Sequence, residues 1–483
     1  MTQAPPLALS DNGHPAGAHE PPAPPAPPDH PRDPWVWCMA LPALFGIVAG
    51  AGLTTPSGPY FDEVHYLPAA RDMLDQWAGV STQYINREHP LFGKTLIALG
   101  MQIFGDNPLG WRIMPLIAGV VAMGASMRAL WHASHDRFAT IAFGALLLSG
   151  FHLFVQARIA MLDIFMLAFL ALAAWQYIAA MREPETGRWR LALCGIAIGL
   201  ALGSKWNAVP LAMAFGLSFL GARLAADRRR LFTSRRGIPV PGISLVEAFV
   251  WLGIVPLLVY AATFLPGYGL GSEAAPSPLV SGGLIALHGE MLDLQSQVLA
   301  PHSYQSTWPQ WVLNTRSIWY LYEVTDGAQR GVMLIGNPLT MLLGVLALVW
   351  CLWSGILRRG WAHVEARRGW AQIGARRGWA RIGARRGWAQ IGVVAGYAIS
   401  LGLWVVAPKS VQFYYHYLTP SVFLLGALAL TLSDLREAGH PRIAIGCVLA
   451  SLLVFAGFYP ILSAAPLAGP MSFLDWAWID GWR

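Results

Sequence analysis

Apolar stretches close to the length of a membrane-spanning helix recur along most of this 483-residue chain and limit what it can fold into. A helix needs roughly 20 apolar residues to cross the hydrocarbon core of a membrane. Charged residues make up 12% of the chain, against about a quarter of a soluble domain. The sequence therefore predicts an all-α integral membrane protein with about 11 transmembrane helices. We place these helices at about 36–54, 111–130, 138–156, 160–181, 191–203, 206–222, 244–264, 331–353, 391–407, 417–433 and 442–459.

The distribution of arginine predicts the orientation of these helices. Cytoplasmic loops retain positive charge, and most of the 33 basic residues fall on one side if the N-terminus is inside, including the Arg-rich stretches 223–236 and 358–390. We therefore expect a multi-pass protein of the cytoplasmic (inner) membrane with a cytoplasmic N-terminus and an outside C-terminus. The net charge of +7 is then a topology signal and not a nucleic-acid footprint.

The chain divides into a tail, two membrane regions and two long outside loops. Residues 1–34 are rich in Pro, Ala and His and are predicted to be a disordered cytoplasmic tail. The remaining parts are an N-terminal transmembrane catalytic region at 35–264 that contains the first outside loop at 55–110, a second outside loop at 265–330, and a C-terminal transmembrane region at 331–483. Long loops of this kind are usually functional. Within the first loop, 65–78 and 91–104 read as amphipathic helices that cover the bundle.

A short repeat occupies the loop at 358–390, where RRGWA begins at Arg358, Arg367, Arg376 and Arg385. One interpretation is an interfacial segment with Trp at the lipid headgroups and Arg on anionic lipid. The other is a tandem duplication without a function of its own. The sequence leaves both open.

The strongest chemical signal is a pair of adjacent carboxylates, Asp62 and Glu63, a few residues after the first predicted helix. Ionisable groups at a membrane are costly and usually functional. Cations follow in the same loop region, among them Lys94 and Arg112. A carboxylate base beside a group of cations is what transfer from a phosphate-linked donor requires, because one group takes a proton from the nucleophile and the others hold the leaving phosphate.

These residues belong to a series of motifs that resembles the protein O-mannosyltransferase family. The series comprises Asp62-Glu63, HPLFGK at 89–94, Arg112, ARIAMLD at 157–163, GSKW at 203–206, HSYQSTW at 302–308, GNP at 336–338 and FYYHYL at 413–418. Two departures stand out: Leu91 replaces the usual second proline after His89, and 265–330 is too short for the β-trefoil insertion of the eukaryotic members. The resemblance therefore points to a bacterial-type enzyme.

The resemblance implies a GT-C glycosyltransferase that moves mannose from a polyprenyl-phosphate carrier to Ser or Thr of exported proteins. It implies that Asp62 is the general base, with inversion at the sugar carbon, and that Glu63 positions acceptor or sugar. The donor phosphate would be held by Lys94, Arg112 and Arg158. Further candidate contacts to donor or acceptor are His89, Asp163, Lys205, His302, Trp308 and His416.

Several of these residues have equally simple structural interpretations. Arg158 and Asp163 could form a buried ion pair, His89 and His302 could anchor loops, and Lys205 could meet a lipid headgroup. The aromatic run at 413–417 could be an interfacial belt. No cluster of carboxylates and histidines has convincing metal-ligand geometry. The lipid-linked donor is a substrate, and the sequence leaves a divalent-metal requirement open.

The predicted partners are the polyprenyl-phosphate sugar donor, the exported protein acceptor and membrane lipid, with the export machinery as a further candidate and no nucleic acid. Two rival functions remain. One keeps the donor chemistry and uses a lipid or glycolipid acceptor, as in lipid A-modifying enzymes. The other is a transporter or flippase, which is disfavoured because the notable charges gather at one membrane face and no half-repeat is visible.

Overall fold

The computed structural model describes residues 32–80, 82–226, 231–233, 238–273, 275–367, 374–407 and 409–483, and for 357–386 it describes no side chains. One compact unit, Asp33–Arg483, holds nearly all of these residues. The predictions made for the tail at 1–34 and for the side chains of the RRGWA repeat thus fall almost entirely outside the described residues.

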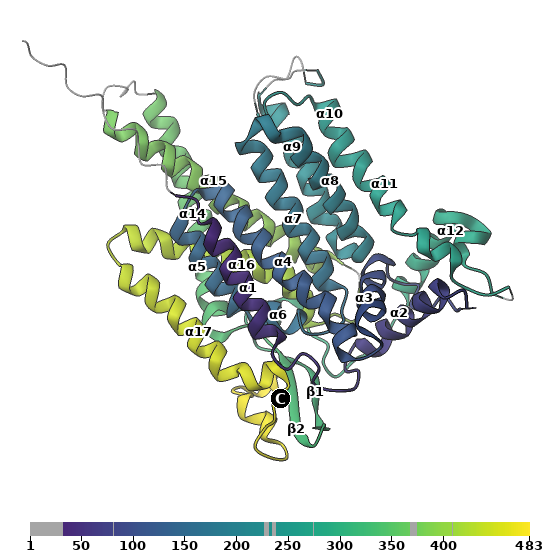
Figure 1. Cartoon of the computed structure of the whole chain (residues 1–483). Coiled ribbons are helices and arrows are strands. Elements are labelled where there is room, and N and C mark those ends of the chain that lie inside the picture. Colours follow the sequence, from purple (N-terminus) through teal and green to yellow (C-terminus); the bar gives the residue numbers. More distant parts are fainter. Residues whose placement is uncertain are drawn as a thin grey trace, which may run out of the picture. The chain divides into compact units, whose positions relative to one another are not determined.

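Membrane-length helices dominate this unit (Figure 1). Within the described residues, eight are long and apolar enough to cross a membrane: Pro108–Ser134, Asp163–Arg182, Trp206–Ala226, Leu245–Gly269, Pro338–Ile356, Gly387–Val406, Tyr414–Glu437 and Pro441–Ser463. Shorter apolar helices cover Trp35–Gly50, Phe92–Phe104 and Arg137–Leu148. An integral membrane protein is therefore supported, while the number of 11 spans stays a prediction.

The helices pack closely because small residues line their contacts. The bundle contains α1 (Trp35–Gly50), α4 (Pro108–Ser134), α5 (Arg137–Leu148), α6 (Phe151–Gln156), α7 (Asp163–Arg182), α8 (Gly187–Ser204), α9 (Val209–Ala226), α10 (Leu245–Phe249), α11 (Val255–Ala262), α14 (Pro338–Arg367), α15 (Gly374–Val406), α16 (Leu418–Glu437) and α17 (Pro441–Ser463). A Cβ atom on Gly195 of α8 would lie 2.0 Å from the carbonyl oxygen of Trp251. Such close approach is how helices associate where no hydrophobic effect drives them together.

One predicted helix is broken. The span expected at 138–156 is divided into α5 and α6 at Ser149 and Gly150. The break frees the carbonyl of Ser149, which accepts a hydrogen bond from Asn337 Nδ2 at 3.2 Å. A non-helical backbone at membrane depth needs such internal partners, so the asparagine of the 336–338 motif has a structural use.

The segments outside the bundle gather at one end of it. The two amphipathic helices expected in the first outside loop are present as α2 (Glu63–Trp77) and α3 (Phe92–Phe104). They lie at the same end of the bundle as α12 (Pro278–Ser296). The C-terminal end of α9 and the N-terminal end of α10 lie at the opposite end (Figure 1). Asp62 directly precedes α2.

The all-α prediction is wrong in one place, where the chain forms an antiparallel hairpin of β1 (Ile318–Thr325) and β2 (Ala328–Leu334). The run IWYLYEVT is rich in aromatic and β-branched residues, which favour strands. Asp326 and Gly327 both have positive φ, as a two-residue hairpin turn requires. Residues 331–334, which we had expected in a spanning helix, therefore belong to β2, and α14 begins only at Pro338.

Candidate active site

Asp62 stands at the entrance to α2, directly after a strained residue. Phe61 has a φ of 50°, which costs free energy for a bulky side chain and persists only where surrounding contacts enforce it. Its ring stacks on Tyr320 of β1, with 3.9 Å between the ring centroids. The hairpin therefore helps to fix the backbone that presents Asp62.

The Asp62 carboxylate is half-buried. Within the described residues it has neither a hydrogen bond nor an ion pair at contact distance. Burial raises its pKa to about 6, against the opposing effect of the Lys205 charge. A carboxylate with such a pKa is still mostly ionised at pH 7, and it is a stronger base than an exposed aspartate. Its environment is that of a proton acceptor.

Lys205 and Asp163 form a buried ion pair beside Asp62, with 2.6 Å between Nζ and Oδ2. Lys205 lies in the extended turn between α8 and the short helix Trp206–Ala208, and Asp163 begins α7. Lys205 Nζ also lies 5.2 Å from the centre of the Tyr415 ring. The motifs at 157–163 and 203–206 thus meet beside Asp62.

A further cation, Lys409, was missed by the sequence analysis. It is half-buried in the segment between α15 and the aromatic run. Burial lowers its pKa, as does the charge of Lys205, while Asp163 and Asp62 oppose this. The available signal was a single basic residue four positions before the start of FYYHYL. The structure therefore brings two lysines to the face that carries Asp62.

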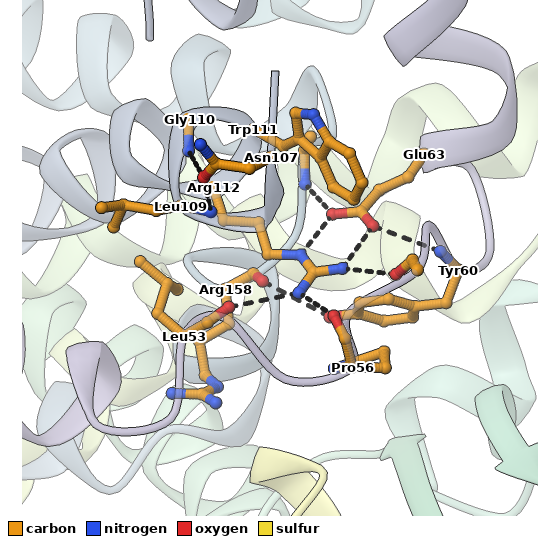
Figure 2. A network of polar contacts seen from close by, with 12 residues as sticks. Leu53, Pro56, Tyr60, Glu63, Asn107, Leu109, Gly110, Trp111, Arg112 and Arg158 are labelled. Carbon is orange, nitrogen blue, oxygen red and sulfur yellow. Dashed lines mark hydrogen bonds and ion pairs between the residues drawn. The ribbon is translucent and has the colours of Figure 1, made fainter. Parts of the chain in front are cut away.

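Glu63, adjacent to Asp62, faces a different environment (Figure 2). Its two carboxylate oxygens accept bonds from Arg112 Nε at 2.8 Å and Nη2 at 2.9 Å. They also accept from the backbone N–H groups of Ala160 and Tyr60 at 3.1 and 3.2 Å. Neither side chain of the Glu63–Arg112 pair is exposed to solvent. We expected Glu63 to position acceptor or sugar; its geometry instead joins three segments of the protein.

Arg112 uses all five of its N–H groups within the protein. Besides Glu63, its guanidinium donates to the carbonyls of Leu53, Pro56 and Gly58 at 3.2, 2.7 and 2.9 Å. No N–H group remains for the donor phosphate that the resemblance assigned to it. The arrangement instead fastens the α1–α2 connection to α4.

Lys94 and Arg158 show the same pattern. Lys94 Nζ is fully buried and donates to the carbonyls of Asn86 and His89 at 2.6 and 2.9 Å. Its burial lowers its pKa to about 7. Arg158 donates to four backbone carbonyls, those of Ala49, Ala51, Gly52 and Ser463. The alternative ion pair of Arg158 with Asp163 is not formed, because Asp163 pairs with Lys205.

The remaining predicted residues are spread around the site. His89 is half-buried with its Nδ1 3.4 Å from Gln295 Nε2 of α12. His302 is exposed and meets Phe413 edge to face at 5.2 Å, and Trp308 is 38% exposed at the start of α13 (Trp308–Val312). The aromatic run is not an interfacial belt, because residues 414–417 are all buried. In the described parts of the chain, no three metal-binding side chains come together.

A solved structure with the same fold defines the class. The "Structure of S. cerevisiae protein O-mannosyltransferase Pmt1-Pmt2 complex bound to the sugar donor" matches with a TM-score of 0.69 at 14% identity and covers 94% of this chain and 93% of that chain. Undecaprenyl phosphate-bound ArnT from Cupriavidus metallidurans matches with a TM-score of 0.51 at 17% identity, over 86% of this chain and 64% of that one. The fold is that of the GT-C membrane glycosyltransferases.

Sequence comparisons then identify the family. The model of "Dolichyl-phosphate-mannose-protein mannosyltransferase" matches residues 88–260. The model of the "C-terminal four TMM region of protein-O-mannosyltransferase" matches 281–482. A polyprenol-phosphate-mannose–protein mannosyltransferase of Corynebacterium glutamicum is 29% identical over 75% of this chain and 81% of its own length. One of Mycobacterium tuberculosis is 27% identical over 89% and 88%. The chain belongs to the protein O-mannosyltransferase family and is a glycosyltransferase.

Proposed function

We propose that this enzyme transfers mannose from a polyprenyl-phosphate-linked donor to Ser or Thr hydroxyls of exported proteins, with Asp62 as the general base. The names of the bacterial relatives support the donor and the acceptor class. The observation that carries the catalytic assignment is the half-buried Asp62, whose pKa is raised to about 6 beside Lys205 and Lys409.

The chemistry is a single displacement. Asp62 takes the proton of the acceptor hydroxyl while that oxygen attacks the anomeric carbon of the sugar. The bond between this carbon and the phosphate oxygen breaks, and the phosphate leaves with the electron pair. Attack from the side opposite the leaving group inverts the anomeric centre. Lys205 and Lys409 are the cations placed to stabilise the charge that develops on the phosphate.

Glu63, Lys94, Arg112 and Arg158 are then structural in this proposal. Each is buried, and each is bonded to backbone groups or to another of the four. Breaking such a buried pair is strongly destabilising, by about 3–5 kcal/mol. Their substitution should therefore disturb the loop that presents Asp62 and leave no direct phosphate contact to remove.

We propose that this site faces the outside of the cytoplasmic membrane. Helices α2, α3 and α12 lie at one end of the bundle, and α9 ends and α10 begins at the opposite end (Figure 1). In the sequence, the Arg-rich stretch 223–236 falls between the last turn of α9 and the start of α10. Positively charged connections stay in the cytoplasm. The acceptor protein would then meet the enzyme after export.

The experiment is a transfer assay with purified full-length enzyme in lipid nanodiscs. Radiolabelled polyprenyl-phosphate mannose is offered with either a Ser/Thr peptide or a glycolipid. We expect label on the peptide, and its release by β-elimination would place it on a hydroxyl. Label on the glycolipid alone would favour the lipid-acceptor enzyme. Label on neither acceptor would overturn the proposal.

A further inference from the structure

His416 is a buried polar side chain whose bonding capacity is unused. It is 6% exposed, and within the described residues neither Nδ1 nor Nε2 has a hydrogen-bond partner. Leaving a buried donor or acceptor unsatisfied costs about 1–3 kcal/mol. An orphaned group of this kind needs an explanation in a folded protein, and an absent ligand is one.

The imidazole ring is held in a fixed orientation by aromatic neighbours. Trp404 of α15 stacks on it with 3.6 Å between the ring centroids and 12° between the planes. Tyr415 meets its edge at 4.4 Å, and Trp311 lies 6.0 Å away in a T-shaped arrangement. These apolar faces offer the two nitrogens no partner. They do set the plane in which a hydrogen bond can form.

His416 belongs to the wall of the candidate active site. The neighbouring Tyr415 ring lies 6.1 Å from the Phe61 ring and 5.2 Å from Lys205 Nζ. The charged or titratable groups that act most strongly on His416 are Lys205, Lys409 and His89. These come from the α8–α9 turn, the segment before the aromatic run and the α2–α3 connection. The imidazole therefore lies among the groups that surround Asp62.

We propose that His416 hydrogen-bonds a hydroxyl of the sugar being transferred and so contributes to the choice of sugar. This inference rests on the proposed function. A neutral imidazole has one donor and one acceptor nitrogen, and a sugar hydroxyl is likewise donor and acceptor. The two lysines already provide the charge that a phosphate needs. A rigid, uncharged, bifunctional group fits the sugar part of the donor.

The energetic consequence is selectivity. A site built to hydrogen-bond a hydroxyl discriminates strongly against an analogue that lacks it, because the buried polar group is then left unpaired. Replacing His416 by an apolar ring removes that penalty. The variant should therefore lose activity on the natural donor and also lose its ability to distinguish one deoxy sugar.

The test compares mannose with its 2-, 3-, 4- and 6-deoxy forms, each as the polyprenyl-phosphate donor. Full-length enzyme in nanodiscs is assayed for kcat/KM as wild type, His416→Phe and His416→Gln. For mannose we expect His416→Phe to lose roughly 10-fold, the value of about one hydrogen bond. For the deoxy donor that lacks the hydroxyl bound by His416, the variant and the wild type should have the same kcat/KM. His416→Gln, which keeps donor and acceptor atoms, should recover part of the discrimination.

A buried histidine elsewhere in the bundle gives the control. His152 of α6 is 3% exposed, leaves Nε2 unpaired and packs between Tyr414 and Tyr417. His152→Phe should change kcat/KM for all five donors by one common factor. Equal deoxy penalties in wild type and both His416 variants would overturn the proposal, even if a variant is less stable, because the ratio between donors is unaffected by the folded fraction. Failure of wild type to transfer mannose at all would instead overturn the proposed function.

Discussion

At the scale of single residues, the adjacent carboxylates Asp62 and Glu63 have opposite environments. Glu63 is fully buried and bonded to Arg112 and two backbone amides. The Asp62 side chain is half-buried and has neither a hydrogen bond nor an ion pair among the described residues. Both oxygens of Glu63 are therefore engaged by donors of the protein itself. The unpaired neighbour is the one able to exchange a proton.

The first prediction concerns Asp62→Asn. The change keeps the shape and removes the base, so turnover should fall by roughly 100-fold or more while donor binding persists. In wild type, kcat/KM should rise with pH and level off above an apparent pKa near 6, because the raised pKa of Asp62 makes the carboxylate ionise there. Donor titration and a pH–rate profile measure both. Unfolding of the variant, or loss of its donor binding, would contradict the assignment.

The second prediction separates phosphate binding from scaffolding. Lys409→Ala removes a charge beside the site, so donor affinity should fall by roughly 10- to 100-fold, the value of a charged hydrogen bond, with little change in melting temperature. Arg112→Ala breaks a buried pair and should lower the melting temperature instead, at a cost of about 3–5 kcal/mol. Lys409→Arg is the matched control and should retain most donor affinity. A donor affinity that depends on Arg112 and is independent of Lys409 would reverse the two roles.

The sequence predicts some of these residues better than others. Lys205 and Asp163 became candidates only through the family resemblance. The sequence itself singles out the adjacent carboxylates Asp62 and Glu63, because charges directly after an apolar run stand out. It does not separate Glu63 from Asp62, since adjacent residues with the same charge differ only in what packs against them. Lys409 was missed for a related reason: nothing local distinguishes a lysine that folding places beside Asp62.

At the scale of elements, α12 is tied to the site at two places. Arg87 and Glu290 form an ion pair at 2.8 Å, and Gln295 Nε2 donates to the carbonyl of Glu88 at 2.8 Å. In the middle of α12, His288 Nε2 lies 2.6 Å from the Tyr260 hydroxyl, which accepts from Trp206 Nε1 at 2.8 Å. The second connection reaches the residue next to Lys205. Helix α12 therefore links the α2–α3 connection with the lysine turn.

The third prediction follows from this link. Tyr260→Phe removes the hydroxyl that joins Trp206 to His288, and a hydrogen bond contributes about 0.5–1.5 kcal/mol. Backbone amides of α12 should then exchange with solvent roughly 2- to 10-fold faster, whereas those of α3 should not change. Hydrogen exchange read by mass spectrometry measures both helices at once, with α3 as the internal control. Unchanged protection of α12 would show that the hydroxyl carries none of the attachment.

The sequence predicted poorly those elements in which the local preference for a strand or a break competes with an apolar run long enough for a spanning helix. Residues 331–334 read as part of a spanning helix because they continue the apolar run of α14. The Asp326-Gly327 turn and the aromatic strand before it pair this segment into β2 instead. The break between α5 and α6 was also missed, because the asparagine that satisfies it comes from a distant part of the chain.

At the scale of the whole molecule, the candidate site is built from residues of the unit Asp33–Arg483. The fourth prediction is that deletion of residues 1–30, or reduction of the RRGWA repeat to one copy, leaves specific activity within a few-fold. None of the residues assigned to the candidate site lies in either segment. Activity per correctly inserted molecule is the quantity to measure. A large loss from either deletion would assign that segment a function.

Charge and hydropathy predict the membrane class well because both act along the whole chain. They do not determine the number of spans, since α1 and α5 fall below the length of the other spanning helices. Packing against neighbours decides whether such a short helix crosses. The orientation of the protein in the membrane depends less on the number of spans, because it is set mainly by the Arg-rich stretches.

The last prediction tests that orientation, and with it the face on which Asp62 works. Arg-rich loops remain in the cytoplasm, and α2 and α3 lie at the end of the bundle away from the connected ends of α9 and α10 (Figure 1). A reporter that is active only after export should therefore be active when fused after Arg483. The same reporter placed within 358–390 should be inactive there, while a reporter that is active only in the cytoplasm should show the reverse.

Insertion of one reporter in the 265–330 loop is the control, because that loop shares the face of α12 and should behave like the C-terminal fusion. If all three sites reported the opposite side, Asp62 would face the cytoplasm. Acceptor proteins would then have to be modified before export, and the proposed coupling of mannose transfer to exported chains would be lost even if the chemistry at Asp62 were correct.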